Sequence, residues 1–253
     1  MKTKKHSFVI TLITVIAVGL IAALIGGMGI DSYALNSTAV TLTATDGTQT
    51  VLTVDASTSA ATYSWDADTC TLTLNGYEGR TITTNGDINI HLLGNNTLIL
   101  DPDEITYGTM GLNLDYCAGC ATITAGEGGT LNIIGNIKTY FSAVAGSVNM
   151  VGGTINIDVT TSSSGSLYGF ERSVMFYESD DKVEVNVNIE RTNDESNSFI
   201  YGFYNGADIR MKEDLTINVD IKGSEYDTLY GFSDIGLSSM SEKCVLKPRS
   251  PFE

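Results

Sequence analysis

The sequence predicts an all-β protein, and the expected fold is a right-handed parallel β-helix, a solenoid in which each coil stacks on the preceding one. Three observations predict it: aliphatic and polar residues alternate with period two, Gly and Asn corners recur at short intervals, and one motif occurs three times. A β-sandwich is the alternative, since short alternating strands are also typical of that fold, but it does not explain the recurrent motif.

The alternation indicates strands with one aliphatic face and one face of Asn, Asp, Glu and Thr. No stretch after residue 38 keeps apolar residues at helical spacing for long enough to indicate a helix. The clearest strands lie at 71–74, 87–92, 154–159, 183–189 and 216–221.

The corners and the repeat indicate stacked coils. Gly94, Gly128 and Gly153 lie among short turn sequences, where positive φ angles are common. The motif Leu167–Phe170 (Leu-Tyr-Gly-Phe) returns at 200–203 and 229–232, with spacings of 33 and 29 residues. A period in this range is typical of a solenoid, and aligned coils would stack like residues into ladders.

The N-terminus predicts export. Lys2, Lys4 and Lys5 precede an uncharged, mostly apolar run at 8–30, the pattern of a signal peptide. We expect a signal peptide at 1–34, cleaved after Ala34, and a secreted or surface-displayed mature protein. An uncleaved membrane anchor is the alternative, because the run is long enough to span a bilayer.

The net charge argues against nucleic acid as a partner. The net charge of the chain is −16, which disfavours nucleic acid and anionic lipid and favours cations.

We expect one solenoid domain at 35–237. Residues 238–253 lose the pattern and are expected to form an irregular tail, so that either a partner covers the last coil or the sequence is incomplete.

The cysteines at 70, 117, 120 and 244 are even in number, which is compatible with disulfides outside the cell. Cys117 and Cys120 form a lone CxxC without the second ligand pair of a zinc site or the βαβ context of a redox site. We therefore expect structural cysteines rather than a metal or redox centre.

Two segments, Tyr63–Tyr77 and Gly86–Leu98, carry a resemblance. The phrase from Trp65 to Asn75, followed by Gly86-Asp87 and Gly94-Asn95-Asn96-Thr97, resembles the opening of bacterial surface proteins with a pectate-lyase-like right-handed β-helix. The resemblance implies that fold and, more weakly, calcium-dependent binding of acidic polysaccharide. It assigns no site residue.

Catalysis has little support in the sequence. Enzymes of the pectinolytic class need paired carboxylates or a cationic base beside calcium, and only Asp180-Asp181, in an expected turn, matches any part of this. His91 falls on the polar face of its strand and lacks the partners of a triad base. We expect a non-catalytic protein, with a polysaccharide lyase or hydrolase as the less favoured interpretation.

The candidate ligands are glycans and calcium. Aromatic side chains suit sugar rings, which makes Trp65, Tyr168, Tyr201 and Tyr230 the candidate contacts. The repeated rings have a structural interpretation too, as stacking aromatics, with one ring of each Tyr-Gly-Phe facing the core. Asp101, Asp103 and Glu104 are the densest oxygen ligands and the candidate calcium site. The expected function is binding of polysaccharide or cell-surface glycan, and a structural or adhesive stalk is the alternative.

Overall fold

The structure is a computed structural model that describes residues 39–100, 109–114, 120–177, 179, 181–193, 196–209, 214–233, 235–237 and 245–248. The chain divides into two compact units, Met1–Leu35 and Asn36–Glu253, and every described residue belongs to the second. The described residues form strands and turns only, as the sequence predicts.

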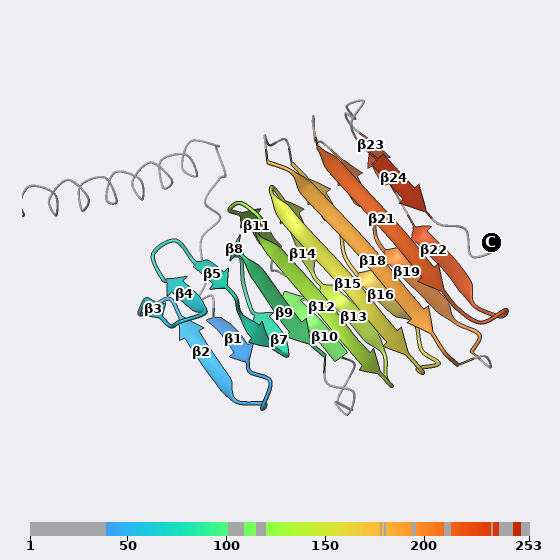
Figure 1. The fold of residues 1–253 in the computed structure, drawn as a ribbon, viewed down its shortest axis with the longest axis horizontal. Coiled ribbons are helices and arrows are strands. Elements are labelled where there is room, and N and C mark those ends of the chain that lie inside the picture. The colour runs from blue at the N-terminus through green and yellow to red at the C-terminus, as the bar shows by residue number, and fades with distance from the viewer. Residues whose placement is uncertain are drawn as a thin grey trace, which may run out of the picture. The chain divides into compact units, whose positions relative to one another are not determined.

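The strands form three sheets, named A, B and C (Figure 1). In spatial order, sheet A contains β2 (Gln49–Thr53), β1 (Ala39–Thr43), β7 (Thr81–Thr84), β10 (Thr109–Leu114), β13 (Phe141–Ala145), β16 (Leu167–Phe170), β19 (Phe199–Phe203) and β22 (Thr228–Phe232). Sheet B contains β23 (Ile235–Leu237), β20 (Ala207–Ile209), β17 (Val174–Phe176), β14 (Ser147–Met150), β11 (Cys120–Ala125), β8 (Ile88–Leu93), β5 (Thr71–Asn75), β4 (Tyr63–Asp66) and β3 (Thr58–Ser59). Sheet C contains β24 (Val245–Pro248), β21 (Leu215–Lys222), β18 (Val183–Arg191), β15 (Gly153–Thr161), β12 (Thr130–Ile137), β9 (Asn95–Ile99) and β6 (Glu78–Gly79).

The order of the strands confirms the solenoid. From β5 onward the chain visits sheets B, C and A in turn, and from β8 onward each strand pairs in parallel with the strand of the preceding coil in the same sheet. Antiparallel sandwich pairing is therefore wrong for this part of the chain. The corners use the predicted turn residues: Gly94 and Gly153 have φ angles of 60° and 95°, which glycine adopts without steric cost.

An antiparallel cap covers the first coil. β1 pairs antiparallel with both β2 and β7, and β4 pairs antiparallel with β3 and β5. The edges of sheets A and B at this end are thus formed by hairpins instead of a further coil. The segments that carry the family resemblance run from the end of this cap into the first parallel coils.

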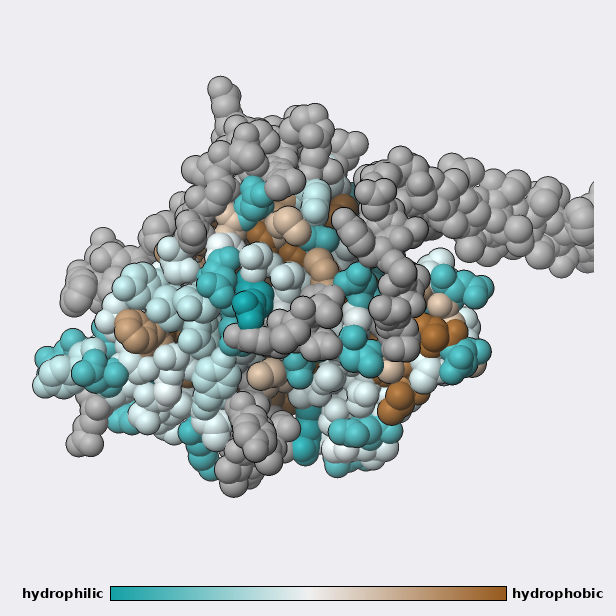
Figure 2. All heavy atoms as spheres, turned by 180° about the vertical axis from the view of Figure 1, so that it is seen from behind, coloured by the Kyte–Doolittle hydropathy of each residue, from teal (hydrophilic) through white to brown (hydrophobic). Residues whose placement is uncertain are grey.

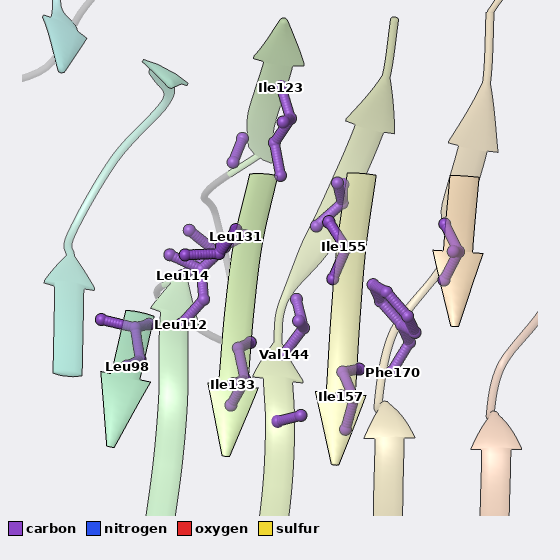
Figure 3. Close-up of a cluster of buried hydrophobic side chains, with 14 of the residues drawn as sticks. Leu98, Leu112, Leu114, Ile123, Leu131, Ile133, Val144, Ile155, Ile157 and Phe170 are labelled. Atoms are coloured by element: carbon purple, nitrogen blue, oxygen red, sulfur yellow. The ribbon is translucent and has the colours of Figure 1, made fainter. Parts of the chain in front are cut away.

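The core is one continuous hydrophobic column, mainly aliphatic, shared by the three sheets (Figure 3). In β18 the inward residues Val183, Val185, Val187 and Ile189 are buried, and the polar residues between them are partly exposed. Each such aliphatic side chain contributes about 1.5–3 kcal/mol when fully buried. The labelled side chains of Figure 3 come from β9, β10, β11, β12, β13, β15 and β16, so every sheet supplies core residues.

The alternation breaks in β16 and β19 of sheet A, at the glycine between the tyrosine and the phenylalanine of the repeated motif. In β16, Tyr168 is half-buried, whereas Gly169 and Phe170 are both buried. A Cβ on Gly202 would lie 2.6 Å from the carbonyl oxygen of Gly231 and 2.7 Å from Val219 Cγ1, so glycine is required for this close approach. The break turns the tyrosine outward and the phenylalanine inward.

A buried ion pair ties consecutive coils together beside this column. The Arg191 guanidinium donates hydrogen bonds to the Asp227 carboxylate, to Ser196 Oγ and to the carbonyl oxygen of Gly165. The side chains of Arg191 and Asp227 are fully buried. Asp227 also accepts hydrogen bonds from the backbone N–H groups of Ser198 and Ser224, at 3.1 and 2.8 Å.

The structure differs from the predicted irregular tail at 238–253. Val245–Pro248 forms β24, which pairs in parallel with β21 from Thr216–Val245 to Val219–Pro248. β24 thus adds one strand to sheet C beyond β21. Among the described residues, no helix has both the length and the hydropathy needed to cross a membrane.

Candidate ligand-binding face

The outer face of sheet A carries an aromatic strip, defined here as Tyr140, Tyr168, Phe199, Tyr201, Tyr204 and Tyr230. Parallel register places Tyr168, Tyr201 and Tyr230 in one column. Their rings stack with centroids 5.3 and 5.0 Å apart and interplanar angles of 6° and 7°. The Phe170, Phe203 and Phe232 rings form a matching stack on the inner side, with centroids 4.7 and 4.8 Å apart. The predicted ladders and the predicted split between inward and outward rings are both present.

Stacking determines which part of each tyrosine meets solvent. Rings that lie nearly parallel cover each other's faces, so the column exposes mainly ring edges and hydroxyl groups. Burial and the neighbouring tyrosines raise the pKa of Tyr201, so its hydroxyl stays protonated and can donate a hydrogen bond. The most exposed rings of the strip are Phe199 at 44% and Tyr230 at 39%.

The strip differs at the end nearest Tyr140, which we call the strip head: Tyr140, Ser142, Tyr168, Glu171 and Tyr204. Here the rings are tilted, at 54° between Tyr140 and Tyr168 and 56° between Tyr168 and Tyr204. The Tyr140 hydroxyl donates a 2.8 Å hydrogen bond to Glu171 Oε1. Glu171 Oε2 and Ser142 Oγ are buried and have no hydrogen-bond partner among the described residues.

The outer face of sheet C is polar, and much of its hydrogen-bonding capacity is used internally. Side-chain amides donate along the coils in an unbroken series, with distances of 2.6, 2.8, 2.8 and 2.6 Å. Asn188 Nδ2 likewise donates to Asp158 Oδ1 at 2.7 Å. The asparagine ladder comprises Asn95, Asn132, Asn156, Asn186 and Asn218. This ladder is a stabilising feature of the stack, and sheet A is the better candidate for ligand contact.

Among the described residues, the large hydrophobic side chains exposed outside the strip are Val51, Val54, Ile99, Ile134 and Tyr226. The face seen in Figure 2 consists largely of hydrophilic and intermediate residues, with hydrophobic residues in small separate patches. The six aromatic residues of the strip are linked by ring contacts, and contiguous apolar groups of this kind commonly mark interaction sites.

The prediction that Trp65 contacts a ligand needs correction. Trp65 is 1% exposed and belongs to the hydrophobic core, and its Nε1 donates a 2.7 Å hydrogen bond to the carbonyl oxygen of Thr53. Both its ring and its polar atom are used inside the cap, since Trp65 lies on the inward face of β4.

The candidate calcium ligands Asp101, Asp103 and Glu104 lie outside the described residues, as do Asp180, Cys117 and Cys244. Among the residues that the structure does describe, no group of three or more His, Cys, Asp or Glu side chains is arranged to hold a metal ion.

His91 and Cys120 both lie on sheet B in settings that suppress reactivity. His91 Nδ1 is 3.0 Å from Thr124 Oγ1, and burial lowers the pKa of His91 despite the charge of Asp181, so the ring is neutral at pH 7. Burial, helped by Asp87, raises the pKa of the Cys120 thiol to about 11. A thiol with this pKa is a poor nucleophile near neutral pH.

Sequence reasoning missed five residues of the strip and its head: Tyr140, Ser142, Phe199, Tyr204 and Glu171. Phe199 and Tyr204 flank the second copy of the motif directly, and Glu171 follows the first. An alignment of the three copies would have placed Phe199, Tyr204 and Glu171 directly beside the motif, but it would not have found Tyr140 or Ser142.

No protein-family model, curated protein or solved structure matches the chain.

Proposed function

We propose that this chain is an exported, non-catalytic protein of the cell surface or its surroundings, and that it binds a carbohydrate polymer along the aromatic strip. The observation that carries the proposal is the strip itself. Its outward rings are additional to the inward phenylalanine stack, which already fills the core beneath them.

The spacing of the strip suits a polymer. Parallel strands repeat at about 4.8 Å, so the tyrosine hydroxyls recur at nearly constant intervals along the stack. A polysaccharide also presents the same hydroxyl groups at regular intervals. An extended chain laid across several coils would therefore meet an equivalent contact at each coil, and weak contacts would add up.

The charge of the protein constrains the glycan. A net charge of −16 repels acidic polysaccharide unless a cation bridges the two. Binding of acidic glycans in the presence of calcium would point to Asp101, Asp103 and Glu104 as ligands and would agree with the family resemblance.

The test is retention of the purified protein on neutral, acidic and amino-sugar polysaccharides, in calcium and in chelator. Tyr230→Ala removes an exposed ring of the strip and is expected to weaken binding about ten-fold, equivalent to about 1.4 kcal/mol. Tyr226→Ala is the matched control, because Tyr226 is 59% exposed and lies outside the strip. Absence of retention on every polymer, or equal losses in both variants, would contradict the proposal.

A structural stalk is the second candidate, and the asparagine ladder favours it. Together with the stacked aromatics, the ladder makes a rigid coil that requires no ligand. Two results would together fit the stalk function: the protein binds no glycan, and variants with one coil added or removed keep the stability of the original protein.

A further inference from the structure

The outer edge of the cap belongs to β2, the last strand of sheet A at this end of the stack (Figure 1). Among the described residues, β2 pairs with β1 alone, and no strand lies along its other edge. Sheets B and C end here in β3 and β6, which have two residues each, whereas β2 has five. Very short strands offer little to a further strand, so β2 is the edge of the cap that can be extended.

The register shows which backbone groups of β2 point outward. The carbonyl oxygen of Thr48 accepts a 2.8 Å hydrogen bond from the residue that follows β1, so Thr48 faces β1. In an antiparallel pair, successive residues direct their backbone groups alternately towards the partner strand and away from it. Gln49, Val51 and Thr53 therefore direct theirs away from β1. The bond that the Thr53 carbonyl oxygen accepts from Trp65 Nε1 agrees with this direction.

The composition of β2 does not prevent pairing with a further strand. Its five residues, Gln-Thr-Val-Leu-Thr, include no proline and no charge, which are common means of blocking an edge. Val51 lies at the centre of the strand and is 60% exposed, and Val54, just beyond its end, is 38% exposed. An uncharged edge with exposed hydrophobic side chains is a template for pairing with another chain.

We propose that two copies of this chain pair through β2, antiparallel and with a two-fold axis at Val51, so that sheet A continues from one copy into the other. Val51 of each copy exchanges two backbone hydrogen bonds with Val51 of the other, and Gln49 lies opposite Thr53. The same surface is used on both copies, so the assembly closes as a dimer. The pairing does not depend on glycan binding.

Charge complementarity favours a second copy over an unrelated strand. With Val51 opposite Val51, Asp55 of one copy lies opposite Gly47 of the other. The Arg80 guanidinium is at that turn: its Nε donates a 2.8 Å hydrogen bond to the carbonyl oxygen of Thr45, and its Nη1 would be 3.9 Å from a Cβ on Gly47. The two-fold axis thus creates two equivalent contacts between Asp55 and Arg80, and such contacts select both partner and register.

Cysteine cross-linking tests the position of the axis. Residues that exchange hydrogen bonds in an antiparallel pair have Cα atoms about 5.5 Å apart, a distance that a disulfide can bridge. Val51→Cys should therefore give a covalent dimer when the purified protein is treated with copper–phenanthroline as the oxidant. Gln49→Cys is the matched control on the same strand, because the two Gln49 positions would be about 13 Å apart along the strands. The unmodified protein measures the background from the natural cysteines.

Exchange of charges tests the choice of partner. Asp55→Arg and Arg80→Glu each bring like charges together at both contacts, and each should weaken dimerisation at least ten-fold in sedimentation velocity. A mixture of the two single variants restores an opposite-charge pair at each contact, so heterodimers should form about as tightly as the original dimer. This recovery is expected only if Asp55 of each copy faces Arg80 of the other.

Val51→Lys places two positive charges at the axis and should abolish the dimer. Ile134→Lys is the matched control, because Ile134 is 36% exposed on sheet C, and it should leave dimerisation unchanged.

Four outcomes would each overturn the proposal. The first is an unmodified protein that is still monomeric at about 1 mM, a measurement that does not depend on the folding of any variant. The second is equal dimerisation of Val51→Lys and Ile134→Lys, and the third is equal cross-linking of Val51→Cys and Gln49→Cys. The fourth is a mixture of Asp55→Arg and Arg80→Glu that stays monomeric although each variant has the circular dichroism spectrum of the original protein.

Discussion

Removal of the Asp227 carboxylate should destabilise the solenoid strongly, and Asp227→Asn makes that change with little alteration of shape. The substitution leaves the fully buried Arg191 guanidinium without its counter-charge. Breaking one side of a buried pair costs about 3–5 kcal/mol. The two carboxylate oxygens accept from different backbone N–H groups, Oδ1 from Ser198 and Oδ2 from Ser224. Asparagine keeps only one of these hydrogen bonds and turns its own amide donor towards the other N–H group, so the value should fall towards the upper end of this range.

The effect should depend on pH with a defined sign. Burial alone would raise the pKa of Asp227, but hydrogen bonds from Ser224, Ser198 and Ser196 and the charge of Arg191 outweigh it and lower the pKa below 3.8. A lowered pKa in the folded state stabilises the protein above the unfolded value, and that stabilisation is lost as the pH falls through the folded value. The difference between the original protein and Asp227→Asn should therefore be constant near neutrality and should shrink below about pH 4.

The assay is urea denaturation followed by far-ultraviolet circular dichroism from neutral to acidic pH. The double variant Arg191→Met with Asp227→Asn removes both charges, and it should be more stable than the sum of the two single effects predicts by about 1–3 kcal/mol. A loss below about 1 kcal/mol for Asp227→Asn at neutral pH, or additive effects in the double variant, would refute the assignment of this pair as a staple between coils.

Three further predictions concern the ladder, the glycine column and the thiol. Asn186→Ala breaks ladder hydrogen bonds to both neighbouring coils and should cost about 1–3 kcal/mol in urea denaturation, whereas Thr216→Ala on the same face should stay within about 0.5 kcal/mol. Gly202→Ala forces a Cβ to within 2.6 Å of a backbone oxygen and should destabilise the protein by about 1–3 kcal/mol. Gly165→Ala is the control and should be nearly neutral, because the nearest atom to its Cβ would be 3.5 Å away. Similar losses of stability for the two variants would contradict the argument that Gly202 is required for close approach. Alkylation of Cys120, followed by mass spectrometry of its peptide, should rise with pH until about pH 11 because the thiol pKa is raised to that value, and a plateau near pH 9 would show that the thiol is solvated.

Local periodicity predicted the parallel part of the fold well, because in a solenoid each strand needs one aliphatic face and each coil repeats the same sequence pattern. The three copies of the motif indeed occupy the register positions of β16, β19 and β22. Strict alternation, however, places residues two apart on the same face. The opposite orientation of Tyr168 and Phe170 depends on the break at Gly169, which alternation alone does not reveal.

Other features depended on contacts between distant residues. The period-two pattern is the same in parallel and antiparallel strands, so it gave no indication that β1 reverses direction against β7. Trp65 was predicted to contact ligand from its residue type, yet its position on the inward face of β4 buries it. The pairing of Arg191 with Asp227 spans 36 residues between corners of unequal length, and the sequence contains no spacing rule for such a contact.

The antiparallel cap also gives the stack a polarity. A parallel in-register coil is a template on which the same chain, or another copy, can add strands indefinitely, as in a fibril. At β7 and β5 the template is occupied by hairpins whose strands run in the opposite direction, so coil-on-coil extension ends there. Any lengthening of the solenoid by duplication of a coil, in evolution or by design, has to take place on the far side of this cap, where a new coil meets a parallel neighbour.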